Sequence, residues 1–272
     1  MRYLKYTLAL LLCLSMAIDA SAHVNPTVKR NKSGKPKKGA SLRMDCAQAT
    51  SQEDMSINNV RARLLNGGDV WWDLNDGKYV VPKVEPGSGI PEKSSIFAGA
   101  VWLGGFDPAG NLKMAAQTYR SGGNDFWPGP LRPEDGLTDV EICSDWNTHF
   151  RVLGEEIKDH LRRYTASINA GEAYADEDIP RNVRGWPARG NRFFFDINGF
   201  ELPNTTQGLA AFFDNDGDGN YEPDDGDYPR IEVRGCDAPQ FPDEMIFWIY
   251  NDAGGIHTQT QGNPIQMEVQ VQ

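Results

Sequence analysis

The 272-residue chain carries 38 acidic against 27 basic residues, a net charge of −11 at neutral pH. This length allows one large domain or two ordinary domains with a full core. The acidic balance excludes nucleic acid as an expected partner, because phosphate binding requires clustered lysine and arginine, and it suits a surface that collects cations. The 28 glycines, 17 prolines and many aromatic residues favour short strands and turns over long helices.

The first 22 residues have the pattern of a secretory signal peptide. Arg2 and Lys5 give a positively charged start, and a run of about a dozen apolar residues follows before the small residues Ala20, Ser21 and Ala22. The run is shorter than the roughly 20 residues of a comfortable membrane span. We therefore expect cleavage after Ala22 and no membrane span in the mature chain; a retained N-terminal anchor is the alternative.

Residues 23–55 are predicted to be a basic, flexible linker. The stretch KRNKSGKPKKGAS has almost no apolar residue and cannot bury enough surface to fold alone. It is either a solvated spacer or a contact with anionic envelope lipid or polysaccharide. Residues 56–272 are predicted to form a β-rich domain.

Hairpins dominate the first half of this domain. Residues 58–74 read as strand, turn and strand around Gly67 and Gly68, and residues 96–120 read as a second hairpin around FDPAGN. A helix is predicted over 153–168, because Leu153, Ile157, Leu161, Tyr164 and Ile168 share one face. His160 is expected on the exposed face of that helix.

Strands are predicted for most of the second half. RFFFDI and GLAAFFD lead into an acidic loop, EMIFWIYND is typical of a buried strand, and residues 265–272 alternate like a half-buried antiparallel strand. The chain stops inside this last strand, so the domain is expected to be incomplete at its C-terminal end. The predicted fold class is mainly β: an antiparallel β-sandwich-like domain with one inserted amphipathic helix and a calcium-type acidic loop.

Three cysteines follow the signal segment: Cys46, Cys143 and Cys236. An exported protein meets oxidising conditions, so one disulfide is expected, and the sequence leaves all three pairings open. The cysteine spacing shows no CxxC pair, which argues against a zinc site.

The loop DNDGDGNYEPDDGDYP, residues 214–229, matches the calcium template D-x-D-x-D-G-x5-E. Asp214, Asp216 and Asp218 take positions 1, 3 and 5, and Gly219 takes the glycine position. Asn220 would offer its carbonyl at position 7, Glu222 would act through water at position 9, and Asp225 replaces the usual Glu at position 12. The flanking segments are not helical, so this is not an EF-hand. A structural Ca²⁺ is predicted; an acidic surface turn and a catalytic metal are the alternatives.

Catalytic motifs such as HExxH, GxSxG and the P-loop do not occur, so the chain is interpreted as leaning towards a non-enzyme. Phe126, Trp127, Asp252 and His257 are a candidate ligand surface, because aromatic rings stack on sugars and the glycine-rich loop 251–264 allows close approach. A tryptophan that packs in the core and a polar connecting loop are the alternatives.

Several stretches together resemble one family. VRARLLNGGDVWWDL, SSIFAGAVWLGGFD, RSGGNDFWPGPL, DNDGDGNYEPDDGDYPRI and FWIYNDAGGIHTQT occur in this order. They resemble the N-terminal region of large exported surface proteins of Bacteroidetes that use the type IX secretion system. The resemblance implies a secreted or cell-surface location, the export machinery as a partner, and a C-terminal sorting domain that this sequence lacks. It implies no reaction.

The expected function is a non-enzymatic, calcium-stabilised module in adhesion or surface assembly. The alternative is a carbohydrate-binding module or secreted polysaccharide hydrolase. Surface glycans or other surface proteins are the expected partners.

Overall fold

The computed structural model describes residues 46–120, 122–205, 208–231 and 241–272. The predicted signal peptide, most of the predicted linker and Cys236 lie outside these residues. Strands in antiparallel sheets dominate the described part, with few helices, as the β-rich prediction expected. None of the helices in these ranges combines the length and apolar character needed to cross a bilayer.

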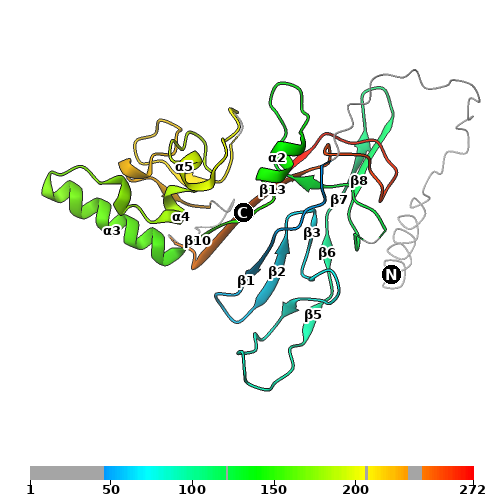
Figure 1. Ribbon diagram of the computed structural model, residues 1–272, viewed down its shortest axis with the longest axis horizontal. Coiled ribbons are helices and arrows are strands. Elements are labelled where there is room, and N and C mark those ends of the chain that lie inside the picture. Colours follow the sequence, from blue (N-terminus) through cyan, green and yellow to red (C-terminus); the bar gives the residue numbers. More distant parts are fainter. Residues whose placement is uncertain (1–45, 121, 206–207, 232–240) are drawn as a thin grey trace, which may run out of the picture. The chain divides into compact units, whose positions relative to one another are not determined.

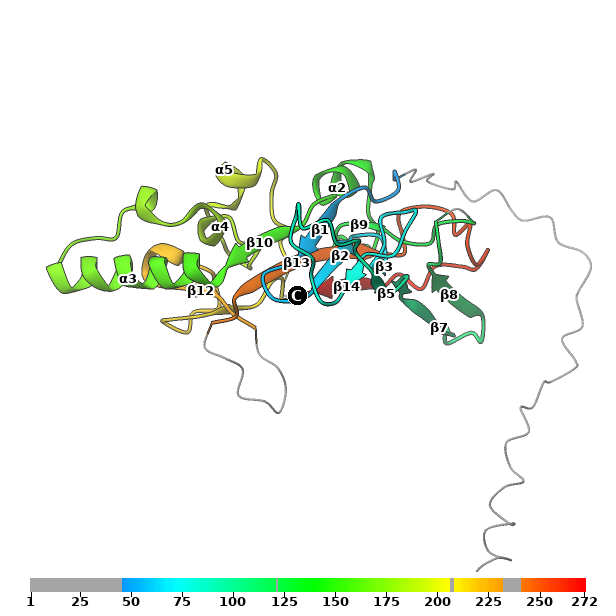
Figure 2. The same ribbon diagram turned by 90° about the horizontal axis from the view of Figure 1, so that it is seen from below.

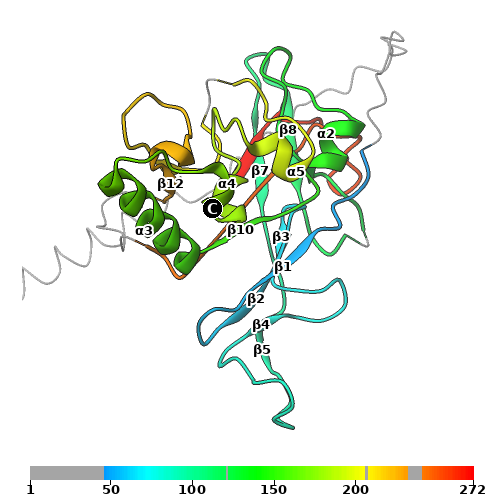
Figure 3. The same cartoon turned by 60° about the vertical axis from the view of Figure 1, so that its left-hand side comes forward.

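The first sheet follows the strand order β5-β4-β2-β3-β6, with β1 also paired to β2. The predicted turn at Gly67 and Gly68 is confirmed, because Leu64 pairs with Val70 across it. Folded structure begins before the expected boundary at residue 56, since β1 pairs with β2 along its whole length (Figure 3). The strands are β1 Gln52–Met55, β2 Arg61–Leu65, β3 Asp69–Val70, β4 Tyr79–Val80, β5 Ser94–Ile96 and β6 Gly99–Ala100.

The second predicted hairpin is also confirmed. Strand β7 (Trp102–Phe106) pairs with β8 (Leu112–Ala116), so that Phe106 lies opposite Leu112. The Asp107 carboxylate accepts the main-chain N–H groups of Ala109 and Asn111 and thereby closes the turn.

Strand β13 (Glu244–Asn251) is the centre of another sheet, as its apolar run predicted (Figure 1). It pairs antiparallel with β10 (Phe150–Leu153), with β9 (Trp127–Pro128) and with β14 (Glu268–Val271). The last of these pairings confirms the antiparallel strand predicted at the end of the chain.

Strand β13 serves two hydrophobic clusters at once. Met245, Phe247 and Ile249 belong to a cluster with the helices, which we call the helical core. The alternate residues Ile246, Trp248 and Tyr250 pack with Leu64, Ala115 and Phe126 in a second cluster, which we call the sheet core. Successive side chains of a strand point to opposite faces, so one buried strand supplies both clusters.

The predicted amphipathic helix is α3, Gly154–Ala170 (Figure 2). Ile157 is fully buried in the helical core, and Leu161 and Tyr164 pack against it. The expectation that His160 is exposed is wrong: its side chain is buried, and Nε2 lies 2.9 Å from the carbonyl oxygen of Asp227. The remaining helices are short: α2 Val140–Asp145, η1 Asp176–Asp178, α4 Arg181–Arg184, α5 Phe194–Asn198 and η2 Pro223–Asp225.

The strand predicted for RFFFDI is wrong, because its first two residues form a turn and the others belong to helix α5, Phe194–Asn198. The Asn191 side chain accepts the N–H of Phe193 and starts a turn, and Gly199 ends the helix in the left-handed region at φ 87°. Phe193 and Phe194 are buried in the helical core, whereas Phe195 is half exposed.

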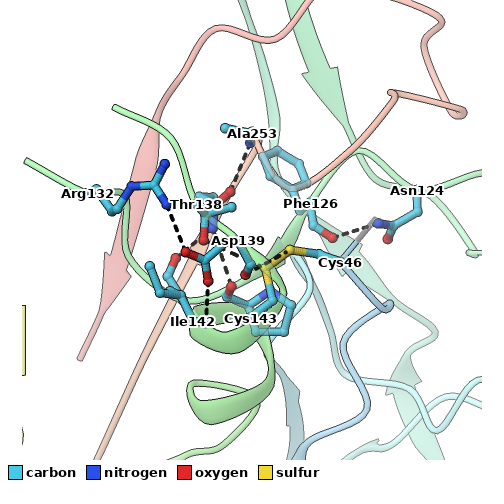
Figure 4. The surroundings of a disulfide bond; sticks show 12 residues. Cys46, Asn124, Phe126, Arg132, Thr138, Asp139, Ile142, Cys143 and Ala253 are labelled. Carbon is cyan, nitrogen blue, oxygen red and sulfur yellow. Dashed lines mark hydrogen bonds and ion pairs between the residues drawn. A yellow bond between two sulfur atoms is a disulfide. The ribbon is translucent and has the colours of Figure 1, made fainter. Parts of the chain in front are cut away.

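The disulfide joins Cys46 to Cys143, with Cα atoms 5.9 Å apart (Figure 4). The bond fastens the first described residue to helix α2. Asp139 caps this helix by accepting the N–H of Ile142 at 3.0 Å, and Arg132 donates to the same carboxylate at 2.8 Å.

Candidate metal centre

The acidic loop is closed at its base by a short ladder. Strand β11 (Phe212–Phe213) pairs antiparallel with β12 (Tyr228–Pro229), and the rings of Phe213 and Tyr228 stack with centroids 4.8 Å apart. Residues 214–227 therefore leave from, and return to, adjacent strands. The pairing of these two strands fixes the two ends of the loop.

Five predicted carboxylate ligands converge in two overlapping groups. Oxygen atoms of Asp214, Asp216 and Asp218 lie within 4.8 Å of one another, and those of Asp216, Glu222 and Asp225 do the same. Asp216 belongs to both groups. The first three carboxylate positions of the template thus form one group, and the last two form a second group with Asp216, although the final acid is the shorter Asp225.

Hydrogen bonds inside the loop hold its turn. Asp214 accepts the main-chain N–H groups of Gly217 at 2.7 Å and Gly219 at 2.8 Å. Gly219 lies at φ 84°, in the left-handed region that favours glycine, as position 6 of the template requires. The side-chain amide of Asn220 donates to Asp218 at 2.9 Å. The ligand that the template takes from position 7 is the main-chain carbonyl oxygen of Asn220.

Asp227 braces the loop from outside the motif. Its carboxylate accepts the main-chain N–H of Asn215 at 2.8 Å and that of Glu222 at 2.8 Å, so one buried side chain ties the start of the loop to its second half. Sequence reasoning missed this residue because it follows the last template position. The sequence does carry a signal for this brace, because the stretch GDYP places one more acid, Asp227, directly before strand β12.

Two anchors fix the loop to the helical core. Tyr221 is fully buried and donates its hydroxyl to the carbonyl oxygen of Val183 at 2.7 Å. Gly226 lies so close to helix α3 that a Cβ atom would come within 2.6 Å of the Tyr164 ring. The acidic run is therefore an anchored loop with carboxylates on its exposed side.

Two acids of this loop region, Glu222 and Asp227, have raised pKa values. Burial raises the pKa of Glu222, and the neighbouring charges of Asp218, Asp224, Asp216 and Asp225 raise it further. Burial raises the pKa of Asp227 to about 6 against the effect of its two main-chain hydrogen bonds. Partial burial also raises the pKa of Asp214, but the N–H groups of Gly219 and Gly217 outweigh it and lower the pKa overall. A cation among these oxygens would relieve the repulsion.

The candidate ligand surface at Phe126, Trp127, Asp252 and His257 is corrected, because all four residues are buried. Phe126 packs edge-on against Tyr250, and Trp127 lies against the His257 ring. The Asp252 carboxylate is occupied by main-chain N–H groups of residues 265 and 267. These groups satisfy one another inside the protein and offer no accessible binding face.

The two most exposed aromatic side chains of the described residues lie on the β7–β8 hairpin, which sequence reasoning missed as a site. Trp102 is 71% exposed and Phe106 is 76% exposed. They point to the same side of β7, because they are four residues apart along a strand. Cross-strand Leu112 extends this apolar face.

Comparisons with protein-family models, with curated proteins and with solved structures find no match for this chain.

Proposed function

We propose that this chain is a non-enzymatic, calcium-stabilised module of a secreted or cell-surface protein, with a role in adhesion or surface assembly. The observation that carries the proposal is the convergence of five carboxylates in two groups that share Asp216. Six to eight hard oxygen ligands are what Ca²⁺ takes, and carboxylates in a tight turn supply them.

The expected ligands are the carboxylates of Asp214, Asp216, Asp218 and Asp225 and the carbonyl oxygen of Asn220, with Glu222 acting through water. The role is structural, since the loop joins β11 to β12 and both strands adjoin the helical core. Bound calcium would hold this corner of the fold, and catalysis by the ion is not part of the proposal.

Two further parts of the proposal concern fold and location. The packing of β13 against side chains of β2 and β8 in the sheet core supports a sandwich-like arrangement. The N-terminal signal pattern and the resemblance to exported Bacteroidetes surface proteins support transport out of the cytoplasm through the export machinery.

Calorimetry of calcium binding tests the proposal, with thermal melts in calcium and in chelator. Asp218→Ala is expected to lower the melting temperature only when calcium is present, because Asp218 is exposed and its main role would be ligation. Glu172→Ala is the control, since Glu172 is an exposed acid that follows helix α3. An equal loss for Asp218→Ala in chelator would contradict a ligand role.

A carbohydrate-binding function is the second candidate, and the β7–β8 hairpin favours it. Exposed Trp102 and Phe106 offer two rings on one face, and sugars stack on such rings. Binding on a glycan array that Trp102→Ala abolishes would support this function. An array without any bound glycan would leave the adhesion or assembly role through other proteins.

A further inference from the structure

His257 lies in a buried position between three segments of the chain. Its ring follows strand β13, contacts strand β8 and packs against the Trp127 indole of β9, with ring centroids 5.9 Å apart. The side chain has no exposed area. Every hydrogen-bonding atom of the ring must therefore be matched inside the protein.

Both ring nitrogens of His257 face acceptors that have no hydrogen to donate. Nδ1 lies 2.8 Å from the carbonyl oxygen of Met114, and Nε2 lies 2.7 Å from the carbonyl oxygen of Asp252. A neutral imidazole carries one N–H and one lone pair, so one of these contacts would place a lone pair against a carbonyl oxygen. Only the imidazolium donates from both nitrogens.

The charges around the His257 ring also favour the imidazolium. Carboxylate oxygens of Asp125 and Asp252 lie 3.8 Å and 3.9 Å from the ring nitrogens, and both side chains are fully buried. Among the described residues, these are the carboxylates within 4.0 Å of the ring nitrogens. Two buried carboxylates with no cation would be costly, because the low dielectric strengthens their repulsion.

His160 provides the internal contrast. Its Nε2 faces the carbonyl oxygen of Asp227, but its Nδ1 lies 3.2 Å from the hydroxyl of Tyr174, which is able to donate. A neutral ring satisfies both contacts. Burial lowers the pKa of His160 to about 4, against a hydrogen bond to Asp227 that raises it.

We propose that His257 is held as an imidazolium: one ring N–H ties the segment 252–267 to Met114 of strand β8, and the other closes the start of that segment onto Asp252. The two flanking carboxylates continue the lock along that segment. Asp125 accepts the N–H of Gln259 at 2.9 Å and the hydroxyl of Thr260 at 2.7 Å, and Asp252 accepts the N–H of Met267 at 2.7 Å. Loss of one ring proton would replace a hydrogen bond by a repulsive contact and loosen the segment.

The test is nitrogen NMR of the whole chain labelled with ¹⁵N-histidine at about pH 7. His257 is expected to show two ring N–H signals and His160 one, with His257 assigned by its contacts to the Trp127 indole. His149→Gln is the assignment control and leaves the His257 signals in place. A single ring N–H signal for His257 in the native chain would overturn the proposal.

Amide exchange then tests the lock itself. After correction for hydroxide catalysis, exchange at Gln259 and Met267 is expected to accelerate over the pH range in which the second His257 N–H is lost. Unchanged protection after that loss would show that the charge does not hold the segment, and would also overturn the proposal.

Discussion

The carboxylate of Asp227 accepts the main-chain N–H of Asn215 at 2.8 Å, across twelve residues of an acidic loop. Its other oxygen accepts the N–H of Glu222 at 2.8 Å. A side chain outside the calcium template thus sets the separation between the two halves of the loop that carry the template.

Asp227→Asn is expected to weaken calcium binding by about tenfold, because an amide offers one acceptor where two N–H groups point, and outer-sphere partners have effects of this size. Calorimetric titration measures the change. Asp224→Asn is the matched control: it removes the same charge, but its carboxylate pairs with Arg192 at 2.7 Å and takes no part in the brace. Equal dissociation constants for the two variants would contradict the bracing role.

Stability is expected to fall in mild acid because of His149. Burial lowers the pKa of His149 to about 4 from 6.5, so between these values the unfolded chain binds the proton and the folded chain does not. The stabilisation is complete above about pH 6.5 and is lost as the pH falls towards 4, by up to about 3 kcal/mol.

Urea unfolding at two pH values measures this effect. His149→Gln is expected to be less sensitive to acid than the native chain, with a remaining dependence from His160. If His149→Gln leaves the slope of the unfolding free energy against pH unchanged, His149 is excluded as a source of the acid sensitivity.

The Cys46–Cys143 bond closes a chain segment with a separation of 97 residues. Restricting a loop of this size in the unfolded chain is expected to stabilise the fold by about 4 kcal/mol. The double variant Cys46→Ser, Cys143→Ser should lose this amount in chemical unfolding and become insensitive to reductant. Peptide mapping without reduction that links Cys236 to either cysteine would contradict the pairing.

The Asp69–Arg120 ion pair is buried, with side chains 0% and 7% exposed, and Asp69 also accepts the indole N–H of Trp72 at 2.8 Å. Asp69→Asn is expected to cost about 3 kcal/mol, because it leaves a buried guanidinium without its partner. Asp54→Asn is the control, since Asp54 pairs with Arg63 at a partly exposed position and such pairs contribute about 1 kcal/mol or less. Similar losses in the two variants would show that burial does not set the strength of the Asp69 pair.

Local patterns explain what the sequence could predict. The two hairpins follow from turn residues, strand β13 from its apolar run, and helix α3 from the spacing of its apolar residues. The acidic loop was recognisable because its ligands are close in sequence, and the five carboxylates do converge.

Long-range contacts explain what the sequence could not predict. The carbonyl oxygen that lies against the buried His160 ring belongs to Asp227, which is 67 residues away in sequence. Met114, which holds the His257 ring, is 143 residues from it in sequence. The polar residues of loop 251–264 suggested a binding surface because nothing in their order shows that their partners are internal.

The position of β13 between the two hydrophobic clusters has a consequence for folding cooperativity. One stretch of eight residues contributes to both the helical core and the sheet core, so neither cluster can be completed without this strand. The described part of the chain should consequently melt in a single transition. A deletion of one residue inside β13 would rotate the following side chains by half a turn and damage both clusters together.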